Sequence, residues 1–461
     1  MTSPIGCPDS WRLVQLKAIS RKIGSGATPT GGQAAYQAKR TNYALVRSQN
    51  VFDRAFSTTG LAFVSDEQAE GLRNVWLEDG DILLNITGDG VTFARACMVP
   101  NSVLPACVNQ HVSIIRLDQT QASPGYVLSY LTHPSVKAYI EAFNAGGSRR
   151  AITKGHIESF VVPLPTLNEQ KAIARLLAAL DDRIAILREI IATLEAIAQA
   201  LFKSWFVDFD PVRAKQQGSI PEGMDDAIAA LFPDGLDESE LGLVPKGWQL
   251  VPFGRLLSHT IGGDWGSDEL NQKDDTRVAI IRGTDIPDLR SGANSRVPIR
   301  YTSTKKLATR KLQRGDVILE VSGGSKDQPT GRSLYMTEGL LRQFDCPVEP
   351  ASFCRLLRPH SENIGVLLGQ HLSYIYAQGK TWEYQNQSTG IANFQTAHFL
   401  EAELVAVPSD EVLTAFASIV CPMLDRGHLT QMQRLVEIRD TLLPRLISGQ
   451  LRVAEAEALV A

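Results

Sequence analysis

Hydrophobic and polar positions alternate with two different periods along this chain. Short apolar runs rich in branched residues, such as "ILLNIT" (82–87) and "VILEVS" (317–322), predict β-strands. Each run follows a Gly-Asp pair, which favours a tight turn, and leads into a glycine-containing loop. After residue 165 a helical period replaces this pattern. The strands and helices do not alternate regularly, as they would in a doubly wound fold, so we expect the α+β class.

The strand-rich pattern occurs twice. "LEDGDILLNITG" (77–88) matches "LQRGDVILEVSG" (312–323), and three further pairs of segments follow the same order. The further pairs are 8–16 with 245–253, 43–51 with 278–286, and 146–165 with 386–408. A helical segment follows each block. The sequence therefore predicts an αβ domain followed by a long helix, used twice.

The helical segment after the first block carries apolar residues at alternating steps of four and three, which is a heptad seam. Its members are Ile173, Leu177, Leu180, Ile184, Leu187, Ile191, Leu194, Ala198, Leu201 and Trp205. This helix should be about 50 Å long, with Asn168 capping its start. Its expected partner is the second copy, 409–447, in which the same step is kept by Met432, Leu435, Leu442 and Leu446.

Pro422 is expected to kink or break the first turns of the second helix. Antiparallel pairing of the two helices would form a coiled-coil-like rod with one αβ domain at each end, related by a pseudo-twofold axis. The alternative is that residues 173–205 are buried in one common core.

These patterns divide the chain into five parts, namely an αβ domain at 1–165, a helix at 166–206, a linker at 207–245, an αβ domain at 246–408, and a helix with a tail at 409–461. The linker holds nine acidic and two basic residues and is rich in Pro and Gly, so we expect an exposed, extended segment. The net charge of −4 therefore hides two mildly basic domains.

Several function classes lack their sequence signatures. The six cysteines are scattered and the eight histidines show no metal-binding spacing, so we expect reduced thiols and no metal. The chain has no phosphate-binding loop, no nucleophile elbow and no methyl-donor loop. No apolar run reaches the ~20 residues of a membrane span, and the N-terminus does not resemble a signal peptide. We expect a cytoplasmic, non-catalytic protein without a cofactor of its own.

Candidate DNA-binding residues lie in the repeated loops and in a run from 289 to 315 that has eight basic residues and no acidic one. Arginine suits guanine, and Asn or Gln suits adenine, because each can make two hydrogen bonds to a base edge. A solvated helix face and ordinary loop drift are the alternatives. The predicted set is Arg47, Thr87, Asp89, Arg95, Arg149, Arg150, Lys154, Arg282, Arg296, Arg300, Lys305, Lys306, Ser325, Lys326, Arg332, Gln385, Asn386 and Ser388.

Nearly the full chain resembles the specificity subunit of a type I restriction-modification system. The resemblance depends on the two Gly-Asp segments, on "VVPLPTLNEQKAIARLLAALDDRI" (161–184) and on "RDTLLPRLISGQLRV" (439–453). The second junction, 405–420, departs from the family by lacking the Glu-Gln pair. The resemblance implies two target-recognition domains that each read half of a split double-stranded DNA site.

It also implies partner subunits. Two adenine methyltransferase subunits would carry S-adenosylmethionine and dock on the helices through the seam residues, and restriction subunits would carry the ATP-driven motor and nuclease. Two other functions stay open at this stage, a stand-alone DNA-modifying enzyme and a protein-only scaffold. Methyl transfer by the purified chain would favour the first, and salt-sensitive DNA binding would argue against the second.

Overall fold

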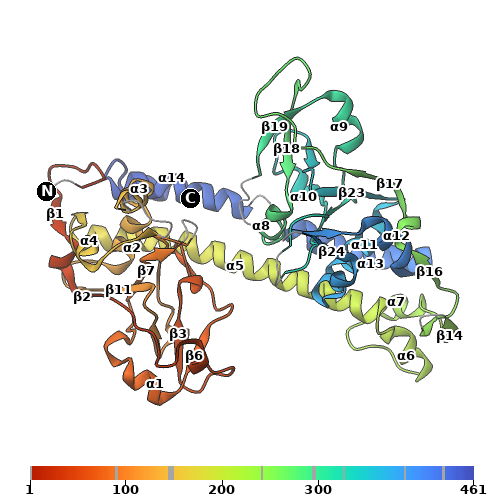
Figure 1. Cartoon of the computed structure of the whole chain (residues 1–461), viewed down its shortest axis with the longest axis horizontal. Helices are drawn as coiled ribbons and strands as arrows, with labels where there is room; N and C mark the ends of the chain where they lie inside the picture. The colour runs from red at the N-terminus through yellow and green to blue at the C-terminus, as the bar shows by residue number, and fades with distance from the viewer. Residues whose placement is uncertain are drawn as a thin grey trace. The chain divides into compact units, whose positions relative to one another are not determined.

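The computed structural model describes residues 3–88, 92–143, 150–239, 242–292, 297–324, 328–388, 391–427 and 431–460, with the backbone alone at Gln387, Ser388, Ile391 and Val460. The chain forms two compact units. Unit 1 comprises Met1–Ala185 and Leu435–Ala461, and unit 2 comprises Ile186–Arg434. Figure 1 shows the elements of both units.

Unit 1 combines short strands with few helices. Its strands are β1 (Arg12–Gln15), β2 (Ser20–Ser25), β3 (Tyr43–Val46), β4 (Val51–Phe52), β5 (Ala55–Phe56), β6 (Ala62–Val64), β7 (Ile82–Asn85), β8 (Thr87–Gly88), β9 (Ala96–Met98), β10 (Ala106–Val108), β11 (Val112–Leu117), β12 (Arg150–Ala151) and β13 (Val161–Leu164). Its helices are α1 (Asp66–Gly71), α2 (Pro124–Leu131), α3 (Pro134–Ala142), α4 (Lys154–Glu158), the first half of α5 (Leu167–Phe206), most of α14 (Gln431–Ile447), and α15 (Val453–Val460).

Unit 2 has the same mixture. Its strands are β14 (Leu236–Ser239), β15 (Gly242–Pro245), β16 (Gln249–Pro252), β17 (Leu257–Gly262), β18 (Thr276–Ile281), β19 (Ile299–Thr302), β20 (Val317–Glu320), β21 (Ser333–Tyr335), β22 (Val348–Pro350), β23 (Cys354–Pro359), β24 (Gln385–Ser388), β25 (Ile391–Phe394) and β26 (Leu404–Val407). Its helices are the second half of α5, α6 (Asp210–Gln216), α7 (Asp226–Ala230), α8 (Ile286–Arg290), α9 (Thr304–Arg310), α10 (Glu338–Leu341), α11 (Glu362–Ala377), α12 (Thr396–Ala402) and α13 (Asp410–Gly427).

The sheets repeat in the same order, which confirms the predicted duplication and the α+β class. The sheet β2-β11-β7-β9 of unit 1 corresponds to β17-β23-β20-β21 of unit 2, and both are antiparallel. The sheet β10-β3-β6 corresponds to β22-β18-β19, and in both the first pair is parallel and the second antiparallel. The two-stranded pairs β1-β13 and β16-β26 complete the correspondence.

The repeated Gly-Asp pair begins the central strand of each larger sheet. Gly80 and Gly315 have φ of 80° and 90°, which glycine adopts without strain. Asp81 accepts a hydrogen bond from the backbone N–H of Glu78 and pairs with Arg116 on β11. In unit 2 the same contacts join Asp316 to the Gln313 N–H and to Arg358. The motif therefore recurs because a buried aspartate both closes the turn and ties it to the neighbouring strand.

The strand after each Gly-Asp pair is apolar throughout because both faces of the sheet are covered. Ile82 and Leu84 belong to one hydrophobic cluster of unit 1, and Leu83 belongs to another. In unit 2 Val317 and Leu319 face one cluster, and Ile318 the other. Alternate side chains of a strand point to opposite faces, so a continuous apolar run is required here.

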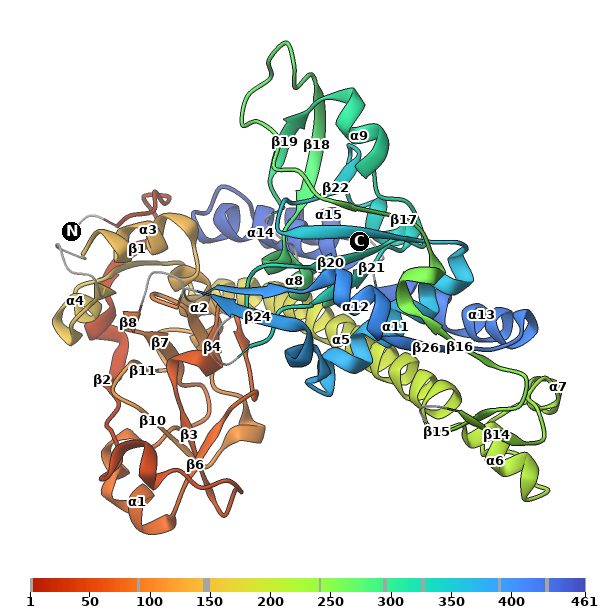
Figure 2. The same ribbon diagram turned by 45° about the vertical axis from the view of Figure 1, so that its right-hand side comes forward.

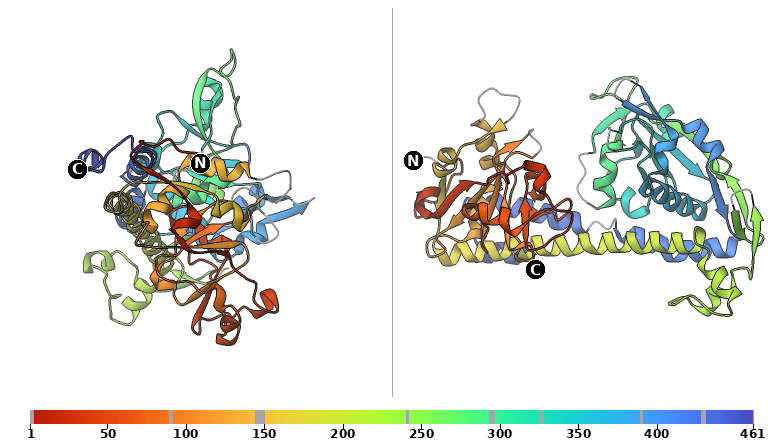
Figure 3. Two further views of the ribbon diagram at one scale, coloured as in Figure 1. Left: turned by 90° about the vertical axis from the view of Figure 1, so that its left-hand side faces the viewer. Right: turned by 60° about the horizontal axis from the view of Figure 1, so that its bottom comes forward.

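Helix α5 is continuous over 40 residues, which confirms the predicted long helix (Figure 3). It begins at Leu167, so the Asn168 cap is wrong, and the Thr166 hydroxyl accepts a hydrogen bond from the Glu169 N–H instead. The buried Gln170 accepts from the Ser123 N–H and donates to the Pro165 carbonyl, which fixes the start of α5 to the start of α2.

The seam of α5 is buried inside the units. Of the predicted seam residues, all are buried except the half-buried Leu187, Leu194 and Leu201. In unit 2 the helix runs antiparallel to α13, since Ile191 lies against Gly427 while Phe206 packs on Phe416. In unit 1 the hydrophobic core includes Ile173, Leu177 and Leu180 of α5 together with Leu442 and Leu446 of α14. Met432 is buried and Leu435 is half-buried.

Two expectations about the connecting segments are wrong. Residues 207–245 are not extended, because α6, α7 and the β14–β15 hairpin form there and Phe209, Val212 and Phe232 join the core of unit 2. The predicted break at Pro422 is wrong, since α13 continues to Gly427, and the predicted kink stays a prediction. The buried face of α13 offsets the hydrogen bond that proline removes.

Candidate nucleic-acid interface

Four segments of unit 1 that are distant in sequence meet around Asn85. Its side-chain amide donates to the carbonyls of Ser48 and Thr92 at 2.9 Å each, and its backbone N–H donates to the carbonyl of Arg95 at 2.9 Å. Strand β12 pairs with β8, which sets Arg150 opposite Gly88. The structure thus brings together the predicted residues Arg47, Thr87, Arg95 and Arg150, which lie in or beside these segments.

Arg47 and Arg95 of unit 1 each lie over an aromatic ring. The guanidinium carbon of Arg47 lies 5.3 Å from the centre of the Tyr36 ring, and that of Arg95 lies 4.6 Å from the centre of the Phe52 ring. In the described part of unit 1 neither arginine has an acidic partner. Cation–π contacts orient a guanidinium without neutralising it, so both arginines keep their charge for phosphate or a base edge, while Arg47 Nη2 also donates to the Gly60 carbonyl.

The turn between β10 and β11 adds polar groups that the sequence did not single out. The Thr87 hydroxyl lies 2.6 Å from His111 Nδ1, and the exposed Gln110 amide lies 3.2 Å from His111 Nε2. A Cβ on Gly26 would lie 2.2 Å from the carbonyl oxygens of Val108 and Asn109, so only glycine allows the chain to pass beside this turn. No recognisable motif marks these residues, because the turn differs between the two copies.

Unit 2 repeats the arrangement with acids in place of amides. Asp285 replaces Asn50 at the turn, and each caps the backbone N–H of the preceding arginine, Arg282 or Arg47. The Asp285 carboxylate also accepts two hydrogen bonds from the Arg282 guanidinium, at 2.9 and 2.7 Å, which raise the pKa of Arg282 above its ordinary value.

The second acid is Glu320, which occupies the position of Asn85. Arg332 Nε donates to Glu320 Oε2 at 2.8 Å, and Arg332 Nη2 donates to Oε1. These hydrogen bonds raise the pKa of Arg332. Arg282 and Arg332 are therefore held by carboxylates, unlike Arg47 and Arg95.

These segments of unit 2 border a pocket of about 660 Å³. Its walls include Trp265, Arg282, Glu320, Gly323, Arg332 and Phe353. Trp265 and Phe353 both line this pocket and are 40% and 67% exposed, which is unusual for large aromatic residues. Phe353 belongs to the turn that corresponds to Gln110 and His111, and the sequence pattern marked neither it nor Trp265.

The β24–β25 hairpin, which Figure 2 shows beside α12, carries the predicted amides. The Gln385 carboxamide oxygen accepts hydrogen bonds from the Thr330 N–H and hydroxyl at 3.1 and 3.2 Å, so this residue fixes the hairpin to the segment that leads into β21. Asn386 is exposed and accepts a hydrogen bond from Gln395 at 2.7 Å.

A buried cluster fixes the base of the same hairpin. The Glu403 carboxylate accepts from His371 at 2.8 Å, from Lys380 at 2.7 Å and from the Tyr384 hydroxyl at 2.6 Å. Burial alone would raise the pKa of Glu403, but these hydrogen bonds outweigh burial and lower the pKa to about 2.

The basic run of unit 2 is largely paired within the unit. Arg300 is buried against the Trp265 ring, with its guanidinium carbon 4.6 Å from the ring centre, and pairs with Asp268. Lys306 lies 2.8 Å from Asp264. Lys305 is exposed and has no acidic partner in the part of the chain that the structure describes.

Some predicted residues lie outside the cluster or outside the description. Lys154 begins α4, where its Nζ is 3.6 Å from Glu158 Oε1. Arg150, which belongs to the cluster around Asn85, also has an acidic neighbour, with Nη1 3.5 Å from Glu141 Oε2. The side chains outside the described residues are those of Asp89, Arg149, Arg296, Ser325, Lys326 and Ser388.

The described residues offer neither a metal-binding cluster nor a membrane-spanning helix. No group of three or more His, Cys, Asp or Glu side chains there could hold a metal ion. None of the helices among the described residues is both long and apolar enough to cross a membrane.

Comparison with known proteins gives consistent results. A family profile, the type I restriction modification DNA specificity domain, matches residues 11–196. The chain is 25% identical over 457 residues to the type I restriction enzyme HindI specificity subunit of Haemophilus influenzae, covering 89% of this chain and 94% of that protein. It is 23% identical over 343 residues to the MjaIX specificity subunit of Methanocaldococcus jannaschii, covering 72% and 71%.

The fold has a solved counterpart. The crystal structure of a type I restriction-modification system S subunit from M. genitalium superposes with a TM-score of 0.53 at 15% identity, covering 97% of this chain and 99% of that one. At this identity the likeness concerns the fold.

Proposed function

This chain belongs to the specificity subunits of type I restriction-modification systems, and we propose on that premise that each of its two units reads one half of a bipartite DNA site. The chain is the non-catalytic component that recognises DNA sequence. Because the units are not identical, the two half-sites need not form a palindrome.

One observation supports the proposal most. In each unit, a turn that carries one arginine (Arg47 or Arg282) and a second arginine (Arg95 or Arg332) lie near the end of the four-stranded sheet. The residues beside these arginines differ between the units. Asn50 and Asn85 in unit 1 are replaced by Asp285 and Glu320 in unit 2. A shared framework with different side chains around it is what two readers of different sequences require.

We further propose that α5 receives partner subunits. Ile186, Ile190 and Ile197 are 56%, 46% and 41% exposed and lie on one face of the helix, within an arc of about 40°. The seam residues are buried or half-buried, so they pack within the units, and the exposed isoleucines are the better candidates for docking. The partners would be two adenine methyltransferase subunits with S-adenosylmethionine and restriction subunits with ATP, acting on DNA in the cytoplasm, while this chain binds no cofactor.

The test is to map methylated adenines in cells that carry the whole system, with the wild-type chain and with Arg150→Ala. We expect the wild-type chain to direct methylation to a split sequence. Arg150→Ala should weaken recognition of the half-site that unit 1 reads and leave the other half-site unchanged, because Arg150 lies beside Thr87 and Gly88 in unit 1. Lys17→Ala is the matched control, since Lys17 is also exposed in unit 1 and pairs with Glu158.

Two results would contradict the proposal. Methyl transfer by the purified chain with S-adenosylmethionine alone would make it an enzyme. Methylation of the same sites in cells that lack this chain would make it a scaffold without a role in recognition.

A further inference from the structure

The pocket of unit 2 exposes aromatic side chains beside arginines. Trp265 follows β17, and Phe353 lies in the turn between β22 and β23. Gly283, Gly323 and Gly324 form parts of the wall where no side chain intervenes. A wall of this kind lets a planar group approach the backbone closely, and exposed aromatic rings gain free energy when such a group covers them.

Arg332 and Glu320 border the same pocket, and their geometry fixes how the arginine can act. The Glu320 carboxylate occupies the Nε and Nη2 edge of the guanidinium, with Nε to Oε2 at 2.8 Å. Glu320 is nearly fully buried, its side chain 2% exposed, and that of Arg332 is 16% exposed. Since a guanidinium has five N–H groups, the two on Nη1 and one on Nη2 remain for a ligand.

A fork of Nη1 and Nη2 matches one base edge in particular. Guanine presents two acceptors, O6 and N7, side by side in the major groove, and arginine binds both. Because Glu320 restrains Arg332 before DNA arrives, less side-chain entropy is lost on binding.

Unit 1 shows what the carboxylate changes. At the corresponding position the Asn85 side chain donates to the carbonyls of Ser48 and Thr92, and the Arg95 guanidinium lies over Phe52 instead. The corresponding arginine is therefore oriented by a ring in unit 1 and by a carboxylate in unit 2. The two arginines should differ in the base position they reach.

We propose that Arg332, held by Glu320, reads a guanine of the half-site that unit 2 recognises, and that Phe353 and Trp265 contact the same base pair or its neighbour. The inference rests on the proposed function and names the specificity-determining residue within it. Arg332 makes the base contact, and Glu320 acts as a positioning residue.

The experiment selects sequences from a randomised DNA library with the full chain in complex with its methyltransferase subunits. We expect one position of one half-site to require guanine in the wild type. Arg332→Ala and Arg332→Lys should each lower the preference for guanine at that position by about 10-fold to 100-fold, because a lost bidentate contact costs ~1–3 kcal/mol of discrimination. The other half-site should keep its preferences.

The lysine variant keeps the charge and tests geometry, so it carries the experiment even if the alanine variant fails to fold. Arg342→Ala is the control, because Arg342 is an exposed arginine of unit 2 that pairs with Glu338 and does not border the pocket. Glu320→Gln should reduce the preference for guanine while DNA binding persists, because Arg332 keeps its charge but loses its restraint.

Unchanged guanine preference in both Arg332 variants would overturn the inference, and so would a loss that is equal for all sequences, which is the mark of a phosphate contact. Glu320→Gln with the wild-type preference would overturn the positioning role. A wild-type complex with no sequence preference would instead overturn the proposed function, so the two failures can be told apart.

Discussion

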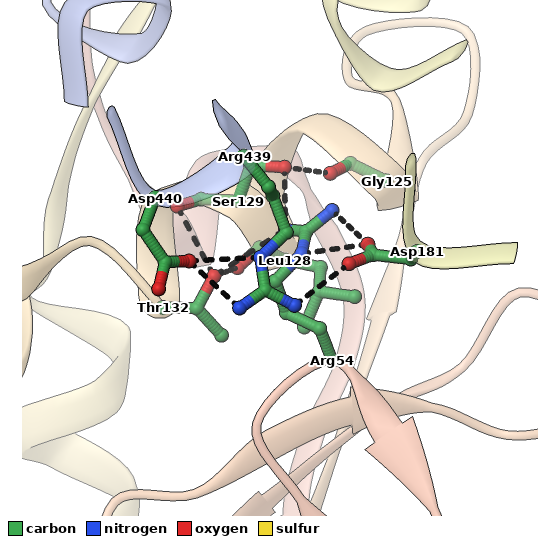
Figure 4. Close-up of polar contacts among 8 residues, drawn as sticks. All are labelled: Arg54, Gly125, Leu128, Ser129, Thr132, Asp181, Arg439 and Asp440. Carbon is green, nitrogen blue, oxygen red and sulfur yellow. Dashed lines mark hydrogen bonds and ion pairs between the residues drawn. The ribbon is translucent and has the colours of Figure 1, made fainter. Parts of the chain in front are cut away.

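Asp181 on α5 pairs with Arg54 from the turn between β4 and β5. Arg54 Nη2 lies 2.6 Å from Asp181 Oδ2, and Nε donates to the same oxygen at 2.7 Å. Figure 4 shows that Arg439 of α14 approaches the same carboxylate, with Nη1 3.2 Å from Oδ1. Arg54 also donates to the hydroxyl of Ser129 on α2. One carboxylate thus joins the αβ domain of unit 1 to both of its long helices.

Asp181→Ala should lower the free energy of unfolding of unit 1 by about 3–5 kcal/mol. The reason is that the Arg54 side chain, only 6% exposed, would keep its charge without a counter-charge. Urea denaturation of the full chain measures the change. The exposed neighbour Asp182 provides the control, and an Asp182→Ala variant as unstable as Asp181→Ala would contradict this account.

Gly26 and Gly263 occupy the same place in the two units, and each passes close to a backbone turn. A Cβ on Gly263 would lie 2.1 Å from the Pro350 carbonyl oxygen. Gly263→Ala should therefore displace the turn that carries Phe353 and destabilise unit 2 by several kcal/mol, of the size typical for forced backbone clashes. Gly262→Ala is the matched control, because no atom lies within 4 Å of a Cβ there. Thermal unfolding of both variants tests this, and equal melting temperatures would refute it.

Local chemistry made much of the fold predictable. The Gly-Asp turns and the strands that follow them depend on neighbouring residues, and the apolar seam of α5 repeats from Ile173 to Trp205, so each could be inferred from its own segment. The tolerance of Pro422 and the folding of residues 207–245 depend on tertiary burial, which no short window contains.

The site was predictable in part for the same reason. Arg47 and Arg282 lie in a repeated pair of segments, and Arg95 and Arg332 follow the glycine-containing loops after the two Gly-Asp segments. The pocket beside Arg332 requires Trp265 and Phe353, which come from turns without a shared motif and meet only through sheet topology. Nor could the sequence show that Asp285 pairs with Arg282 and that Glu320 pairs with Arg332.

Glu403→Gln should destabilise unit 2 most at neutral pH. The folded pKa of about 2 lies below the ordinary value of 4.5, so the carboxylate stabilises the fold above pH 4.5, and this contribution disappears as the pH falls toward 2. The difference corresponds to ~3 kcal/mol. Chemical denaturation at pH 7 and at pH 3 should show a large gap between variant and wild type that narrows at the lower pH. The exposed Glu401→Gln serves as the control, and a gap independent of pH would exclude this explanation.

Glu349 on β22 should show the opposite dependence on pH. Burial, followed by the nearby Asp264 carboxylate, raises the pKa of Glu349 to about 7, although Arg310 and Lys306 act in the other direction. Neither carboxylate oxygen has a hydrogen-bond partner in the described structure. Between pH 4.5 and 7 the folded state therefore binds more protons at this site than the unfolded state, and stability must fall as the pH rises.

Glu349→Gln removes the titrating group, so the stability of the variant should fall less steeply between pH 5 and pH 8, by ~3 kcal/mol over that range. The slope of the free energy of unfolding against pH is the informative quantity. The buried amide of the variant also lowers stability, but by an amount that does not depend on pH. Urea denaturation at closely spaced pH values measures it, with Glu338→Gln as the control, since Glu338 is exposed on α10. If wild type and Glu349→Gln lose stability in parallel as the pH rises, Glu349 is not the group that titrates.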